Sequence, residues 1–124
     1  MKRIVLKFIY VLIFLGITCI NGCKSKDIIE YGNITFWSNV NVDGGNISVT
    51  ISDKGTRTIT GYHEGAASVP CDVEYSAMFL NLPYGTYSYE ASNPEYTWSG
   101  SIDLKQDCLT IKLNGGNGIR KYGW

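Results

Sequence analysis

From residue 33 onward, the chain contains short stretches in which apolar and polar residues strictly alternate, separated by turn sequences. The alternation is clearest at residues 47–51 and again at 109–113. A period of two residues is typical of a half-buried β-strand, and the same region lacks the sustained 3.6-residue period of an amphipathic helix. The pattern therefore predicts an all-β domain over residues 33–113.

The spacing of these stretches favours a fold of two layers. Strands are expected around residues 34–37, 47–51, 56–62, 77–80, 86–92, 96–104 and 109–113, with a long loop over 63–75 and a glycine-rich C-terminal tail over 114–124. Because each strand has one apolar face, we predict a seven-stranded antiparallel β-sandwich of the Ig-like Greek-key type. A small closed barrel is the alternative.

The N-terminus has the pattern of an export signal. Three basic residues precede an uncharged, almost wholly apolar run from Phe8 to Ile20. A basic region followed by roughly 7–15 apolar residues is typical of a secretory signal peptide, and the run is shorter than the ~20 residues that a transmembrane helix needs. An uncleaved anchor and a buried core helix are the alternatives.

The end of this segment, Ile20-Asn21-Gly22-Cys23, resembles the lipobox of bacterial lipoproteins. The resemblance implies cleavage after Gly22 and lipidation of Cys23, so that residues 1–22 are a lipoprotein signal peptide and residues 23–32 a polar tether. More than one acyl chain holds a protein stably on a membrane without crossing it. An ordinary secretory signal with an incidental cysteine is the alternative.

The charge balance and the cysteines limit which functions and cross-links the exported form can have. Without its three signal-peptide bases, the chain keeps eight of its eleven basic residues against eleven acidic ones. This balance predicts no nucleic-acid binding, which needs a basic surplus. Cys71 and Cys108 remain as an even pair, which in an exported protein favours a disulfide. A metal site or a nucleophilic thiol would call for further cysteines or clustered histidines.

Residues 81–89, Asn-Leu-Pro-Tyr-Gly-Thr-Tyr-Ser-Tyr, resemble the turn and strand of prealbumin-like β-sandwiches, which include carboxypeptidase regulatory-like and collagen-adhesin B-type domains. The turn at Pro83–Gly85 is expected to deliver the next strand as an edge hairpin. With further matches at residues 35–37, 58–62, 70–71, 96–100 and 108–113, the chain is similar to small bacterial lipoproteins that carry this sandwich and one disulfide. The resemblance implies a spacer or binding module without shared catalytic residues.

The candidates for chemistry are few. His63 is the single histidine, so any Ser/His/Asp or Cys/His machinery would have to include it, and a plain loop histidine is the prediction. Pairs of acids such as Asp103 and Asp107 are expected to be solvated turn residues. Weak calcium binding by Asp43, Asn46 or Asp53 is an alternative without a spaced motif. We expect no catalytic residue, no cofactor and no resident metal.

Aromatic residues are the most plentiful candidates for binding. Trp37, Tyr62, Tyr75 and Tyr84 fall at outward or turn positions, where aromatic rings make good anchors for a glycan or a protein. The prediction for these four residues is that they cover the second face of the small sandwich, and a surface that binds a ligand or partner is the alternative. The sequence thus predicts a non-catalytic lipoprotein of the bacterial cell envelope, at the outer membrane, that binds or presents a ligand. An envelope inhibitor or immunity-type protein that uses the loop 63–75 is the second hypothesis, and a hydrolase the third.

Overall fold

A computed structural model describes residues 28–121, and this part of the chain contains eight strands and no helix. The strands are β1 (Tyr31–Trp37), β2 (Ile47–Ile51), β3 (Gly55–Ile59), β4 (Ala77–Pro83), β5 (Gly85–Ser92), β6 (Tyr96–Leu104), β7 (Cys108–Lys112) and β8 (Ile119–Arg120). The all-β prediction is confirmed. Residues 28–121 offer no helix long and apolar enough to span a membrane. The predicted signal peptide and Cys23 lie outside the described residues.

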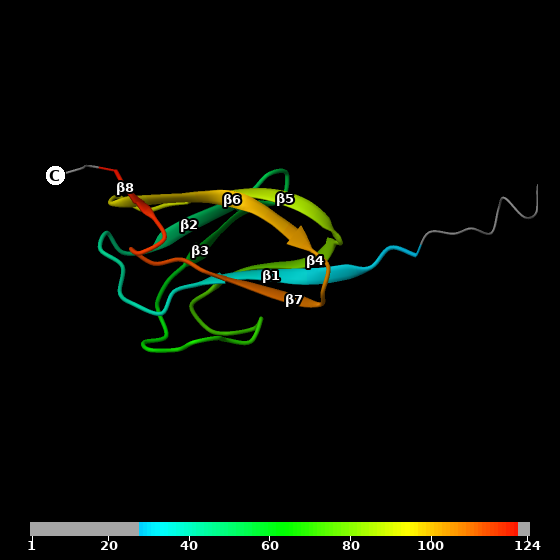
Figure 1. The fold of residues 1–124 in the computed structure, drawn as a ribbon, viewed down its shortest axis with the longest axis horizontal. Helices are drawn as coiled ribbons and strands as arrows, with labels where there is room; N and C mark the ends of the chain where they lie inside the picture. The colour runs from blue at the N-terminus through cyan, green and yellow to red at the C-terminus, as the bar shows by residue number, and fades with distance from the viewer. Residues whose placement is uncertain (1–27, 122–124) are drawn as a thin grey trace, which may run out of the picture.

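The strands form two sheets that share one hydrophobic core. A three-stranded sheet has the order β4-β1-β7, and a five-stranded sheet has the order β3-β2-β5-β6-β8. In Figure 1 the five-stranded sheet is the upper layer and the three-stranded sheet the lower one. Fully buried side chains from both sheets meet between them, among them Ile34, Phe36, Val49, Ile51 and Leu104. This arrangement fits a β-sandwich.

The prediction of seven strands, all antiparallel, is wrong in two respects. β1 and β7 pair in parallel, from Asn33 opposite Cys108 to Trp37 opposite Lys112. An eighth strand lies in the predicted tail, where β8 pairs with the start of β6. Trp98 fixes this segment, because its indole Nε1 donates to the carbonyl oxygen of Asn114 and to Oδ1 of Asn117, both at 3.0 Å.

The turn at Pro83–Gly85 does not form the expected edge hairpin. β4 pairs only with β1, whereas β5 lies inside the other sheet between β2 and β6, so the chain changes sheets at Tyr84. A β-bulge precedes this change of sheet: two residues of β4, Leu80 and Asn81, lie opposite the single residue Asn33 of β1. Asn81 has a φ of 54°, and its backbone N–H donates to Oδ1 of Asn33 at 2.9 Å.

Residues 60–76, which we call the covering loop, lie across the outer side of the three-stranded sheet. In Figure 1 this loop is the green segment below β1 and β7. The hydroxyl of Thr35 on β1 donates to the carbonyl oxygen of Cys71 at 2.7 Å, which fastens the loop over the middle of the sheet. As a result β1 is buried on both faces, and Thr35 is fully enclosed.

Candidate functional site

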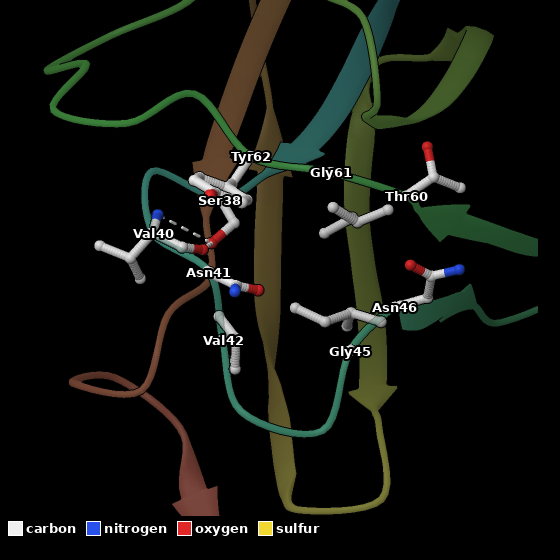
Figure 2. A pocket seen from close by; sticks show the side chains of 11 residues that line it. Ser38, Val40, Asn41, Val42, Gly45, Asn46, Thr60, Gly61 and Tyr62 are labelled. Atoms are coloured by element: carbon white, nitrogen blue, oxygen red, sulfur yellow. Dashed lines mark hydrogen bonds between the residues drawn. The ribbon is translucent and has the colours of Figure 1, made fainter.

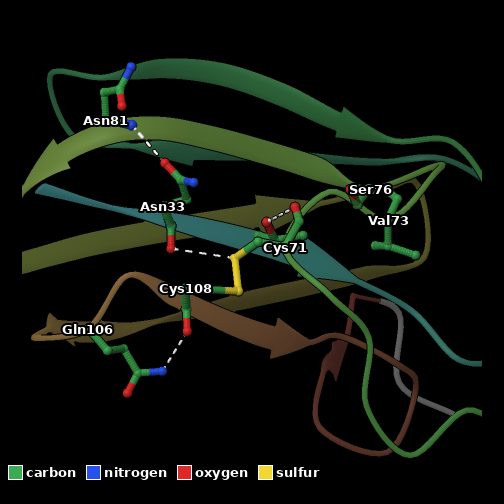
Figure 3. The surroundings of a disulfide bond; sticks show 8 residues. Asn33, Cys71, Val73, Ser76, Asn81, Gln106 and Cys108 are labelled. Atoms are coloured by element: carbon green, nitrogen blue, oxygen red, sulfur yellow. Dashed lines mark hydrogen bonds between the residues drawn. A yellow bond between two sulfur atoms is a disulfide. The ribbon is translucent and has the colours of Figure 1, made fainter.

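The predicted disulfide is confirmed and fixes the covering loop. Cys71 of the loop is bonded to Cys108 at the start of β7, with 5.7 Å between the two Cα atoms (Figure 3). Two backbone hydrogen bonds close the base of the loop. The N–H of Thr60 donates to the carbonyl oxygen of Tyr75 at 3.0 Å, and the N–H of His63 donates to the carbonyl oxygen of Ser38 at 2.9 Å. The loop is therefore held at both ends and near its middle.

Trp37 covers the outer face of the three-stranded sheet, as the sequence predicts, and is not an exposed anchor for a ligand. Only 3% of its surface is accessible, because the side of the three-stranded sheet on which it lies is covered rather than open to solvent. The ammonium group of Lys112, on the neighbouring strand β7, lies 5.9 Å from the centre of its ring. Trp37 therefore belongs to the packing of the domain and is removed from the set of candidate binding residues.

Tyr62 and Tyr75 do lie at the surface, and the covering loop brings them to the same end of the sandwich. Their exposed fractions are 41% and 53%. This end is the one at which β1 finishes. His63, next to Tyr62, is bonded to Ser38 just after β1, and Ala77, two residues after Tyr75, pairs with Phe36 near the end of β1. We call it the loop pole. The two rings remain candidate binding residues.

Tyr75 is held in place although its ring is exposed. Its φ is 64°, a left-handed conformation that is uncommon for an aromatic residue. Its ring packs on Gly61 so closely that a Cβ there would lie 2.8 Å from Cγ of Tyr75. The centroid of the His63 ring lies 5.8 Å from the centroid of the Tyr75 ring. An exposed ring fixed in this way loses little conformational entropy when it binds a partner.

His63 is hydrogen-bonded at the base of the covering loop. Its Nε2 donates to the carbonyl oxygen of Glu74 at 2.7 Å, and its backbone N–H is also bonded. The ring of His63 is therefore bonded within the covering loop, and its backbone N–H is bonded to Ser38, the residue that follows β1. These contacts position the neighbouring Tyr75.

A small pocket of about 110 Å³ opens at the loop pole beside Tyr62. Figure 2 shows Val40, Asn41 and Val42 on one side of it and Asn46 and Thr60 on the other. Its wall combines valine and isoleucine side chains with amide and hydroxyl groups. A pocket of this size and lining suits a single partly apolar group of a larger ligand.

Tyr84 lies at the opposite end of the sandwich, where β1 begins, and does not join the other aromatic residues. Its backbone N–H donates to the carbonyl oxygen of Glu30 at 2.8 Å, and its hydroxyl donates to Oδ1 of Asp107 at 3.3 Å. Desolvation, together with the carboxylates of Asp107 and Glu30, raises the pKa of the Tyr84 hydroxyl above its ordinary value. The side chain is half-buried and packs against the edge of the core.

The covering loop is acidic. Glu64, Asp72 and Glu74 are all exposed on it, and residues 58–104 contain no lysine or arginine. The three acidic residues are visible in the sequence, and the fold places the loop that carries them, together with Tyr62 and Tyr75, over the outer side of the three-stranded sheet. Like charges on a surface favour a partner of opposite charge.

The structure does not assemble a metal site from the predicted calcium candidates. Asn46 precedes β2 and Asp53 follows it, so the two lie at opposite ends of that strand, while Asp43 is 3.9 Å from the guanidinium of Arg120. Between residues 28 and 121 no three His, Cys, Asp or Glu side chains are grouped so as to hold a metal ion.

Comparison with known proteins gives no relative for this chain. No family model, no curated protein and no solved structure matches it. The resemblance to prealbumin-like lipoproteins therefore rests on the residues of this chain that carry it.

Proposed function

We propose that this chain is a non-catalytic, lipid-anchored lipoprotein of the bacterial cell envelope that binds a protein partner through its loop pole. The observation that carries the proposal is that the entry of the chain into β1 and the exposed tyrosines of the covering loop lie at opposite ends of one domain. The polypeptide enters β1 at Tyr31, opposite Pro83, and the exposed Tyr62 and Tyr75 lie beyond the other end of that strand.

The length of the tether supports this arrangement. Residues 24–30 separate the lipobox cysteine, Cys23, from β1, and seven residues span at most about 25 Å when fully extended. A lipid on Cys23 keeps the end of the sandwich that carries Tyr84 close to the membrane. The loop pole is then directed away from the bilayer, toward soluble partners. Figure 1 shows the chain leaving the sandwich at the end away from the covering loop.

The finer fold assignment is part of the same proposal. The two sheets and the Leu-Pro-Tyr-Gly segment at residues 82–85 support a prealbumin-like sandwich of Greek-key type, with β8 as an addition at the edge. Domains of this class act as spacers or binding modules on the surfaces to which they are attached. The outer membrane is the location that we propose for the anchor.

The anchoring step has a direct test with a matched control. Bacteria that express the full chain are labelled with radioactive palmitate. We expect label in the wild type and in Cys19→Ala, and none in Cys23→Ala, because only a cysteine at the lipobox position accepts the diacylglyceryl group. Label that persists in Cys23→Ala, or that disappears in Cys19→Ala, contradicts the assignment.

A second function, inhibition of a secreted or envelope enzyme, is favoured by the covering loop itself. A disulfide and several main-chain bonds hold this loop, and it presents two tyrosines among three exposed carboxylates. Preorganised loops lose less entropy on binding, and aromatic residues carry much of the energy at protein interfaces. A basic enzyme is the partner that such a surface would block.

Photo-crosslinking in intact cells tests both forms of the proposal, because the reaction captures a bound partner in place and needs no purified one. Benzoylphenylalanine at position 75 is expected to form a discrete adduct with a basic protein, while the same residue at position 84, at the membrane-proximal end, is not. Loss of the partner's activity on stoichiometric addition of the lipoprotein identifies an inhibitor, and unchanged activity identifies a presentation module. Equal adducts at both positions, or none at position 75, argue against a docking surface at the loop pole.

A further inference from the structure

The outer face of the five-stranded sheet, remote from the covering loop, is lined almost wholly by hydroxyl groups. On β2, β3, β5 and β6 every outward-facing position carries serine or threonine, except Glu90 and Asp103. The strand registers align these residues in rows, one of which runs from Thr50 through Glu90 to Ser99. Neighbouring strands in a sheet lie about 4.8 Å apart, so the hydroxyl groups form a regular array.

Strand propensity does not explain this composition. Threonine is favoured in strands, but serine is not among the residues enriched there. Ser88, Ser99 and Ser101 nevertheless occupy adjacent outward positions on β5 and β6, with Ser88 directly opposite Ser101. Their short side chains leave open space above the centre of the sheet. The choice of serine therefore has a consequence for the shape of this face.

That space is a groove. Two hollows of about 500 and 600 Å³ lie on this face, and both are lined by Thr50, Glu90 and Ser99, so they form one continuous depression. Residues of the C-terminal segment, Ile119 and Lys121, border one end. The depression is long enough to extend from β8 to the turn between β2 and β3, because Ser52 lines its other end.

The chemistry of the lining selects one class of ligand. A hydroxyl group both donates and accepts hydrogen bonds, as do the hydroxyl groups of a sugar. Protein interfaces are instead depleted in serine and enriched in aromatic residues, methionine and arginine at their centre. Glu90 places a negative charge in the middle of the floor, and none of the ion pairs among residues 28–121 includes it. Lys121 places a positive charge at one end of the depression, so the lining has no surplus charge of either sign that would attract a charged chain.

From these observations we infer that the groove on the outer face of the five-stranded sheet binds an uncharged polysaccharide chain. Ser88, Ser99 and Ser101 supply hydrogen bonds along the floor, and Glu90 accepts hydrogen bonds from sugar hydroxyls at its centre. This site shares no residue with the loop pole. The inference therefore stands or falls independently of the lipid anchor and of the protein partner proposed above.

Affinity electrophoresis tests the inference on the full chain, expressed in bacteria and purified from whole cells in detergent. Native gels contain dextran, laminarin, mannan or arabinoxylan as neutral probes, and polygalacturonate as an anionic probe. We expect at least one neutral polysaccharide to retard the protein and polygalacturonate not to. The variant Ser88→Ala/Ser99→Ala/Ser101→Ala should weaken the retardation at least tenfold in apparent dissociation constant.

The matched control is Thr58→Val/Thr86→Val, which removes two exposed hydroxyls of the same face that do not line the groove and should leave retardation unchanged. Thermal unfolding of each variant checks that the fold is retained, and Ser99→Ala alone, with a smaller loss, replaces the triple variant if its fold is disturbed. The inference is overturned if no neutral polysaccharide retards the protein, if polygalacturonate is preferred, or if the groove variant binds as the wild type does.

Discussion

Removal of the Cys71–Cys108 disulfide is expected to lower the free energy of unfolding by about 4 kcal/mol. The bond joins residues separated by 37 positions, and in the chain-entropy model a closed loop of that length contributes about this amount by restricting the unfolded chain. Urea unfolding of a soluble form that begins at Lys24 measures the effect, with the variant Cys71→Ser/Cys108→Ser compared with the wild type.

The disulfide variant should show a second change that a purely unfolded-state effect would not give. The carbonyl oxygen of Cys71 also accepts a hydrogen bond from the hydroxyl of Thr35. Release of Cys71 from the disulfide therefore loosens the covering loop and uncovers the outer face of the three-stranded sheet. We expect faster amide exchange at Thr35 and Trp37 relative to residues of the five-stranded sheet. Equal stability of the wild type and the variant would mean that the covering loop is held without its covalent bond.

Replacement of Trp37 by alanine is expected to cost about 3–5 kcal/mol, the range for large-to-small changes at buried aromatic positions. Only 3% of the side chain is accessible, so its removal leaves a cavity between the sheet and its cover. Urea unfolding of Trp37→Ala provides the measurement. If Trp37 were exposed to solvent, its replacement would lower the free energy of unfolding far less, because surface substitutions usually change it by no more than about 0.5 kcal/mol.

Tyr62→Ala provides the matched control for this experiment. Tyr62 is another of the aromatic residues singled out by the sequence, and 41% of its surface is accessible. Its replacement should change the free energy of unfolding much less than Trp37→Ala does. Similar losses of unfolding free energy in the two variants would contradict the assignment of Trp37 as a buried packing residue and of Tyr62 as an exposed candidate binding residue.

Much of the fold follows from the local period of the sequence. The alternation at 47–51 and 86–92 predicts strands that the structure contains, and the turn residues between them predict the breaks. Cys71 and Cys108 are also paired as expected. These features depend on neighbouring residues or on a choice among few cysteines, so sequence alone was sufficient to predict them.

The features that escaped prediction depend on contacts between distant segments. Alternation in β1 places Trp37 on an outward face, but the sequence does not show that the covering loop returns over that face. The two residues of β8 are too few for any period, and their position depends on bonds from Trp98 to Asn114 and Asn117. The parallel pairing of β1 with β7 likewise has no local signature. For the same reason the hydroxyl groove emerges only when four strands are placed in register.

The central claim, a binding domain attached to the envelope by a lipid, is tested most directly by mass spectrometry of the N-terminal peptide of the protein isolated from bacterial membranes. The account predicts a mature chain that begins at Cys23 and carries the mass of a diacylglyceryl group on its sulfur, with a further acyl group on the new amino terminus. A mature chain that begins at another residue, or an unmodified Cys23, would contradict it.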